Sequence, residues 1–299
     1  ASMVSTDNGD FDCDILLSSA DYAHTETLLP EANRQYSQRY WERKTFAPSA
    51  LLFYVAFDKK LSNLSHHTLF FDSDFEQHAR TIYDDASWPE DPLFYASFPS
   101  ITDETCAPEG HEAGIFLMPI APGLKEDKEV RKKYFDLIIH RLEFITGQNV
   151  LDNIVFYESY GVDDFVKDYN SYKGNAYGLA NTLLQTHILR PRMKSNKVKN
   201  LYFTGQLTIP GPGIPPSLIS GKIVSDVYFE NRITVINFWF EGCPPCEAEI
   251  PGLNDLVDQY GNSVNFLAIG RNNKEDIIDF LKDHPWKFDH LSSESLINE

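Results

Sequence analysis

Two cysteines separated by two prolines are the residues whose types and spacing most clearly indicate a reaction. Cys243 and Cys246 follow an apolar, strand-like run from Ile233 to Phe240, and they open a segment from Pro245 to Tyr260 with helical spacing of apolar residues. A helix N-terminus favours a thiolate, so Cys243 would attack a disulfide. Cys246, one helical turn further on, would attack the mixed disulfide and release the substrate. The pattern predicts thiol–disulfide exchange.

A zinc half-site and an inert structural pair are the alternatives for these two cysteines. A structural zinc site needs two more thiolate or imidazole ligands at suitable spacing. Cys13 and Cys106 are isolated, and His284 and His290 do not form a pair on one helical face. We therefore predict no metal site.

A second candidate site lies between a predicted strand, Leu201 to Thr204, and a predicted helix, Pro216 to Tyr228. The segment between them contains Gly205, Gly211 and Gly213. Glycines let a backbone approach a ligand closely, and a helix N-terminus offers unpaired N–H groups. This spacing indicates a polar cofactor, with a purely structural strand–helix turn as the alternative.

The order of predicted strands and helices along the chain indicates two domains, residues 1–229 and 230–299. The first is mixed α+β, with strands such as Ala50 to Phe57 and a long amphipathic helix from Lys125 to Thr146. Asp163 to Asn170 is interpreted as the start of an aromatic, polar segment. The second domain is a β-α-β-α run ending in a return strand near residues 288–291, which is typical of a parallel α/β sheet.

The charge balance excludes one class of partner. The chain has 299 residues and a formal net charge of −18, and both predicted domains are acidic, so no basic face for nucleic acid is expected. The one basic cluster, residues 190–197, is expected to be a solvated loop. No apolar run reaches membrane-spanning length and no signal peptide is recognised, which predicts a cytoplasmic protein, with peripheral membrane contact as a further expectation.

Residues 200–225 closely resemble the C-terminal flavin-binding motif of the bacterial carotenoid (phytoene) desaturases. Four further segments resemble that family in its own order: residues 14–26, 63–71, 88–95 and 169–180. The resemblance covers the chain from about residue 10 to residue 229. It implies an amine-oxidase-like α+β flavoprotein fold and FAD-dependent desaturation (dehydrogenation) of a lipophilic polyene, a carotenoid precursor such as phytoene.

The same resemblance implies flavin contacts by Gly205, Gln206, Gly211, Gly213, Ile214 and Pro215. Many related flavoproteins place an acid where Gln206 stands, so the contact of this residue with the ribityl chain is open. Tyr169 to Tyr177 would lie near the reacting end of a polyene tunnel. The family begins with a Gly-x-Gly-x-x-Gly unit that this sequence lacks. We therefore expect a fragment without the N-terminal Rossmann unit, and no desaturation by this chain alone.

The residues from Arg232 onward resemble the N-terminal half of a thioredoxin-like domain of the TlpA/ResA type. That resemblance implies a thiol or disulfide protein partner. It also implies that Glu249 helps to move the proton of the second cysteine, with an ordinary solvated glutamate as the alternative. The hairpin and cis-proline that normally complete this fold are not recognised in the sequence. A third interpretation of the whole chain is a fusion or assembly product without activity.

Overall fold

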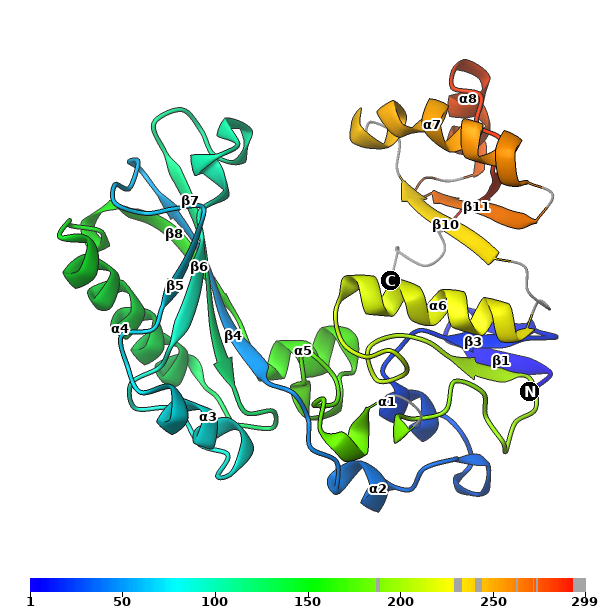
Figure 1. The fold of residues 1–299 in the computed structure, drawn as a ribbon, viewed down its shortest axis with the longest axis horizontal. Coiled ribbons are helices and arrows are strands. Elements are labelled where there is room, and N and C mark those ends of the chain that lie inside the picture. The colour runs from blue at the N-terminus through cyan, green and yellow to red at the C-terminus, as the bar shows by residue number, and fades with distance from the viewer. Residues whose placement is uncertain are drawn as a thin grey trace. The chain divides into compact units, whose positions relative to one another are not determined.

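A computed structural model describes residues 1–186, 189–228, 233–239, 244–261, 263–270, 272 and 274–292. Its residue contacts divide the chain into two compact units, Ala1–Ser217 and Leu218–Glu299, which are described one at a time (Figure 1). The domain boundary predicted at residue 229 stays a prediction. No helix in the described ranges is long and apolar enough to cross a membrane.

The larger part of unit 1 is built on a five-stranded antiparallel sheet. Its spatial order is β5-β6-β7-β4-β8, with the strands β4 (Ser49–Phe57), β5 (His67–Phe70), β6 (Phe94–Ser97), β7 (Glu112–Ile120) and β8 (Ile154–Tyr160). Buried and half-buried residues alternate along all nine positions of β7, because successive side chains point to opposite faces. The long helix α4 (Lys128–Thr146) packs on one face, where the Phe135 ring lies 5.4 Å from that of Phe53.

The other part of unit 1 forms around two short parallel strands, β3 (Leu16–Ser18) and β9 (Leu201–Phe203). Helices α1 (Tyr22–Thr27) and α2 (Gln38–Glu42) supply aromatic side chains to its core. The Tyr22 ring stacks on Phe203 at 3.7 Å between centroids. The buried Glu26 carboxylate accepts hydrogen bonds from the Tyr36 amide and the Trp41 indole, so a polar group is satisfied within this core.

The other elements of unit 1 are shorter. An N-terminal hairpin is formed by β1 (Met3–Thr6) and β2 (Gly9–Asp12), and two further helices are α3 (Phe75–Tyr83) and α5 (Val162–Tyr169). Short 3-10 helices span Glu31–Asn33, Pro99–Ile101, Glu104–Cys106, Leu151–Asn153, Tyr172–Gly174 and Leu183–Gln185.

Unit 2 contains a parallel sheet of order β10-β11-β12. Its elements are β10 (Ile233–Trp239), α7 (Pro244–Tyr260), β11 (Val264–Gly270), α8 (Lys274–Asp283) and β12 (Asp289–Ser292). Apolar residues of both helices pack with Trp239, Phe266 and Ala268 in one core. The β-α-β-α run and its return strand, predicted from the sequence, are confirmed.

The sequence analysis assigns no helix or strand to residues 163–170, whereas the structure forms helix α5 over Val162–Tyr169 after the end of the sheet. The N-cap of this helix is Gly161, which has no side chain to accept a bond. Instead the Asp164 carboxylate accepts a bond from the Gly161 amide at 2.9 Å. The usual Ser, Thr, Asp or Asn signal at the N-cap is therefore missing from the sequence.

Candidate functional sites

The predicted flavin turn, residues 204–213, runs from β9 to helix α6 (Ile214–Tyr228). Thr208 closes the bend, because its amide and its hydroxyl both donate to the Gly205 carbonyl, at 3.0 and 2.8 Å. Three positions have φ values in the left-handed region that glycine adopts without strain: Gly205 (+96°), Gly211 (+136°) and Gly213 (+111°). The glycines are thus required by the backbone path itself.

Four of the six predicted flavin contacts have open space beside the backbone or an exposed side chain. Among the described residues, a Cβ built on Gly205 meets only the Ser19 carbonyl oxygen, at 3.7 Å, and one on Gly213 meets only the ring of the proline three residues on. Ile214 is 81% exposed and Pro215 is exposed. The backbone at Gly205 and Gly213 and the side chains of the next two residues are therefore accessible. The two consecutive prolines carry no amide hydrogen, which limits the donors that the start of α6 presents.

The other two predicted contacts, Gly211 and Gln206, face Arg190 inside the protein. Arg190 Nη1 donates to the Gln206 carbonyl at 3.2 Å, and a Cβ on Gly211 would lie 2.9 Å from Nη2. The Gln206 side-chain amide donates to Asn175 Oδ1 at 3.3 Å. Close approach at Gly211 therefore serves a contact within the protein. A flavin contact by either residue stays a prediction.

The expectation of a solvated loop is wrong at its first residue, because Arg190 is only 3% exposed. Its Nη2 donates to the Leu179 carbonyl and to Asn181 Oδ1, at 3.1 and 2.6 Å. No carboxylate in the described part of the chain pairs with the guanidinium, and burial lowers its pKa. Sequence reasoning missed this residue because a basic run usually marks a hydrated surface.

The sheet face opposite α4 carries a continuous row of apolar and aromatic side chains. The register places Leu69, Tyr95, Leu117, Leu52 and Tyr160 side by side across all five strands. Leu69 is 63% exposed and the other four are half-buried. The row is a continuous apolar strip on this face of the sheet.

Helix α3 lies over one end of this row and borders an open apolar pocket of about 240 Å³. The lining includes Phe75, Ala79 and Ile82 of the helix, together with Leu69 and Leu117 of the sheet. The buried His78 ties the helix to the sheet, since its two ring nitrogens bond to the Pro119 carbonyl and the Leu93 amide, at 2.8 and 2.9 Å. Burial lowers the pKa of His78.

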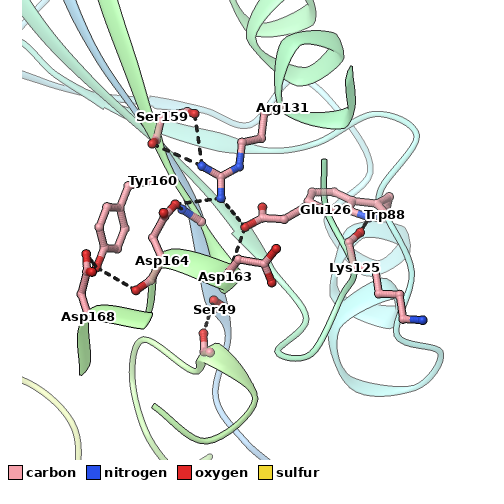
Figure 2. Close-up of polar contacts among 12 residues, drawn as sticks. Ser49, Trp88, Lys125, Glu126, Arg131, Ser159, Tyr160, Asp163, Asp164 and Asp168 are labelled. Carbon is pink, nitrogen blue, oxygen red and sulfur yellow. Dashed lines mark hydrogen bonds and ion pairs between the residues drawn. The ribbon is translucent and has the colours of Figure 1, made fainter. Parts of the chain in front are cut away.

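A buried ionic cluster joins α4 to the start of α5 (Figure 2). Arg131 Nη2 lies 2.5 Å from Glu126 Oε1 and 2.7 Å from Asp164 Oδ2, while Nη1 reaches the Ser159 carbonyl and hydroxyl at 3.4 Å. The Glu126 side chain is 1% exposed and also accepts from the Asp163 amide. Burial lowers the pKa of Arg131, but its bonds to the two carboxylates outweigh that effect and the net shift is upward.

The segment that follows α5 is held in a constrained conformation. Asn170, Lys173 and Gly174 have φ values of +51°, +54° and +62°. Ser49 Oγ donates to the Gly174 carbonyl at 2.6 Å, and the Gly123 amide donates to Lys173 at 2.7 Å. Strained residues of this kind often lie at functional sites. The placement of residues 169–177 at the reacting end of a polyene tunnel stays a prediction.

In unit 2, Cys246 lies in the first turn of α7, is half-buried and is disulfide-bonded. It packs against the core that contains Trp239 and Ile250. Glu249, on the same helix, is exposed. Cys243 lies outside the described residues, so its predicted role is not tested.

Three comparisons with known proteins bear on both units. The chain is 43% identical over 219 residues to a carotenoid 3,4-desaturase of Haloarcula japonica, covering 73% of this chain and 44% of that protein. It is 32% identical to a 4,4'-diapophytoene desaturase of Staphylococcus haemolyticus, covering 73% and 45% of the two chains. The chain thus spans less than half the length of these relatives.

Among solved structures, an oxidoreductase from Methanosarcina mazei superimposes with a TM-score of 0.50 at 14% identity, covering 75% of this chain and 46% of that one. This likeness shows the fold alone. Residues 217–295 match the model of the AhpC/TSA family.

Most of the N-terminal region is therefore similar to carotenoid desaturases, and the C-terminal region is thioredoxin-like. The resemblances to the carotenoid desaturases and to a thioredoxin-like domain, stated from the sequence, are confirmed, while the TlpA/ResA type stays a prediction.

Proposed function

We propose that unit 1 binds the polyene and contacts the FAD of a carotenoid desaturase, in the removal of hydrogen from a carotenoid precursor such as phytoene. The observation that carries this proposal is the apolar row across the five-stranded sheet, which ends in the pocket beside α3. A polyene has no polar groups to pair, so burial of apolar area against this row supplies its binding energy.

Four of the residues predicted to contact the flavin are accessible to it. Gly205, Gly213, Ile214 and Pro215 form an accessible surface on which its ring system can lie. When bound, the flavin supplies the chemistry by accepting the hydrogens taken from the polyene. The protein's own contribution is to orient an apolar chain and exclude water from it.

Delivery of the substrate from a lipid phase belongs to the same proposal. Leu69, Phe71 and Phe75 border the pocket, and each is at least 60% exposed. Exposed apolar side chains at the mouth of an apolar pocket suit a peripheral contact with a membrane that holds the polyene.

The test places a charge in the centre of the row. Leu117→Asp should lower the affinity for phytoene, delivered in liposomes and measured by co-sedimentation, by about tenfold or more, because a buried Leu contributes about 1.5–3 kcal/mol and an acid adds a desolvation cost. Phe144→Asp is the matched control, since Phe144 lies on α4 and is 89% exposed. Equal phytoene binding by the two variants would contradict the proposed site.

A second candidate function is thiol–disulfide exchange in unit 2. The disulfide bond of Cys246 at the start of α7 favours it. A small dithiol should reduce this disulfide in the purified chain and convert it to an alkylatable thiol, detected by mass spectrometry of the peptide containing Cys246. Cys246→Ser should abolish turnover of a disulfide substrate. A disulfide that resists dithiols at neutral pH would remove this function.

A further inference from the structure

Helix α3 is held on the sheet of unit 1 mainly through an ionisable residue. Of its nine residues only His78 is buried. Its apolar residues Phe75 and Tyr83 are exposed, and Ala79 and Ile82 are half-buried. A surface helix usually attaches through a buried apolar stripe. The attachment of α3 therefore depends on the hydrogen bonds of one imidazole more than is usual for a helix.

The two hydrogen bonds of His78 require a neutral imidazole. The Pro119 carbonyl can only accept, so Nε2, at 2.8 Å, carries the hydrogen. The Leu93 amide donates to Nδ1 at 2.9 Å, so Nδ1 presents its lone pair. A proton added to Nδ1 would point at the Leu93 N–H group, and this bond would be lost. Protonation therefore leaves the buried side chain of α3 with an unpaired amide beside it and a charge to solvate.

His78 and both of its partners line the apolar pocket at the end of the row. Helix α3 also contributes Phe75, Ala79 and Ile82 to the lining, opposite side chains of the sheet. Release of α3 from the sheet would therefore remove one wall of the pocket. A polyene carries no charge of its own, so a pH response of its binding has to come from the protein.

The surroundings of His78 oppose a positive charge on its ring. Burial lowers the pKa of His78, the bond to the Pro119 carbonyl opposes that shift, and the Arg141 cation of α4 adds to it. Arg141 itself is engaged with Asp72, since its Nε donates to Oδ2 at 3.2 Å. Further ionisable side chains on α3 and the adjacent strands are the N-cap Asp74, the exposed pair Glu76 and Arg80, Tyr83, and His67 with its partner Tyr95.

We propose that neutral His78 positions α3 as one wall of the polyene pocket, and that protonation of His78 releases the helix and weakens polyene binding. The inference rests on the proposed function of unit 1, in which the row and its pocket bind the polyene. His78 is a positioning residue, because it acts through α3 and its two main-chain partners.

The direction of the pH response follows from the two states of the imidazole. In the released helix the ring has the ordinary histidine pKa of about 6.5, and in the attached helix the pKa of His78 is lower. Attachment is therefore fully present above about pH 7 and is lost as the pH falls through 6.5 toward the pKa of the attached state. Uptake of one proton on release changes this equilibrium by at most about tenfold per pH unit.

Hydrogen-exchange mass spectrometry of the full chain measures the release of α3 without any ligand. Between about pH 7.5 and pH 5.5, after correction for intrinsic exchange rates, protection of α3 should fall by about three- to tenfold, while that of α4 stays unchanged. His78→Gln cannot take up the proton, so its α3 protection should be the same at both pH values. His67→Gln is the matched control, because this histidine is exposed on the adjacent strand β5 and its variant should respond as the wild type does.

Co-sedimentation with phytoene measures the consequence for binding. The liposomes consist of phosphatidylcholine, whose net charge does not change in this pH range. The affinity of the wild type for phytoene should fall by about threefold or more from the higher to the lower pH, because the released helix no longer covers the ligand. His78→Gln should bind phytoene equally at both pH values, and His67→Gln should follow the wild type.

The outcomes separate this inference from the proposed function. If the wild type binds phytoene at neither pH, the proposed function fails, and the exchange data alone decide whether His78 controls α3. If phytoene binds but the protection of α3 is independent of pH, only the inference is overturned. A pH response that persists in His78→Gln overturns it as well, since another group then titrates.

A further measurement covers the case in which His78→Gln does not fold. NMR titration of the wild type, with the His78 ring assigned by through-bond experiments, gives the midpoint of its protonation. The exchange of α3 should change with the same midpoint. Two different midpoints would overturn the inference.

Discussion

Replacement of Gly174 by alanine should destabilise unit 1 by about 4 kcal/mol, which is a large share of the ~5–15 kcal/mol that holds a typical domain folded. Gly174 is buried and has a φ of +62°, which disfavours a side chain. Its added Cβ would also lie 2.4 Å from the Val162 carbonyl oxygen and 2.6 Å from Val162 Cγ1. Backbone atoms at the start of α5 cannot move away cheaply, because Val162 is itself buried.

Gly110→Ala separates the conformational contribution to this loss of stability from the steric one. Gly110 has a similar φ of +76°, but a Cβ there meets no described atom within 4 Å. This control should cost only about 1 kcal/mol, the conformational part alone. Hydrogen-exchange mass spectrometry of peptides from β4 measures the free energy of unfolding in unit 1 separately from unit 2. Equal losses in the two variants would show that the contact with Val162 is not strained.

The second large loss of stability is expected when the ionic cluster of Figure 2 is disrupted. Arg131→Met should cost unit 1 about 3–5 kcal/mol, because it leaves the Glu126 carboxylate, 1% exposed, without its cation. Asp164 loses the same partner at the start of α5. Urea unfolding followed by hydrogen exchange of peptides from α4 and α5 measures this loss of stability.

Two further variants make this prediction specific. Lys132→Met removes the neighbouring exposed pair with Asp136 and should cost no more than about 0.5 kcal/mol. The double variant Glu126→Met, Arg131→Met removes both buried charges, so it should be more stable than Arg131→Met alone. A double variant that is less stable than the single one would mean that the carboxylate is stabilised by its amide partner rather than by the arginine.

Prediction from sequence succeeded where the signal is local. Strand β4 and helix α4 were predicted to within a few residues, because a nine-residue apolar strand and a regular helical stripe of apolar side chains need no distant information. The glycine turn was also placed correctly between strand and helix, since its three positive φ values demand glycine at those positions. Helix α5 was missed because its cap is formed by Asp164 rather than by an N-cap side chain.

The candidate sites depend on contacts between residues that lie far apart in the chain. Nothing in the basic run beginning at Arg190 shows that its guanidinium binds the carbonyl of Leu179 and approaches Gly211. The row from Leu69 to Tyr160 exists only through the register of five strands, which pairs residues far apart in the chain. A shift of one residue in any strand would turn its member of the row to the opposite face.

By itself, the sequence determined the elements with a strong local pattern, namely β4, α4 and the β-α-β-α run of unit 2, together with the glycine-dependent turn, because each rests on neighbours within one or two turns of chain. Only the tertiary structure decided that Gln206 and Gly211 contact Arg190 and that the His290 ring contacts two indoles. Those contacts arise when elements pack, since burial strips water from a polar group and the fold alone sets which partner it meets.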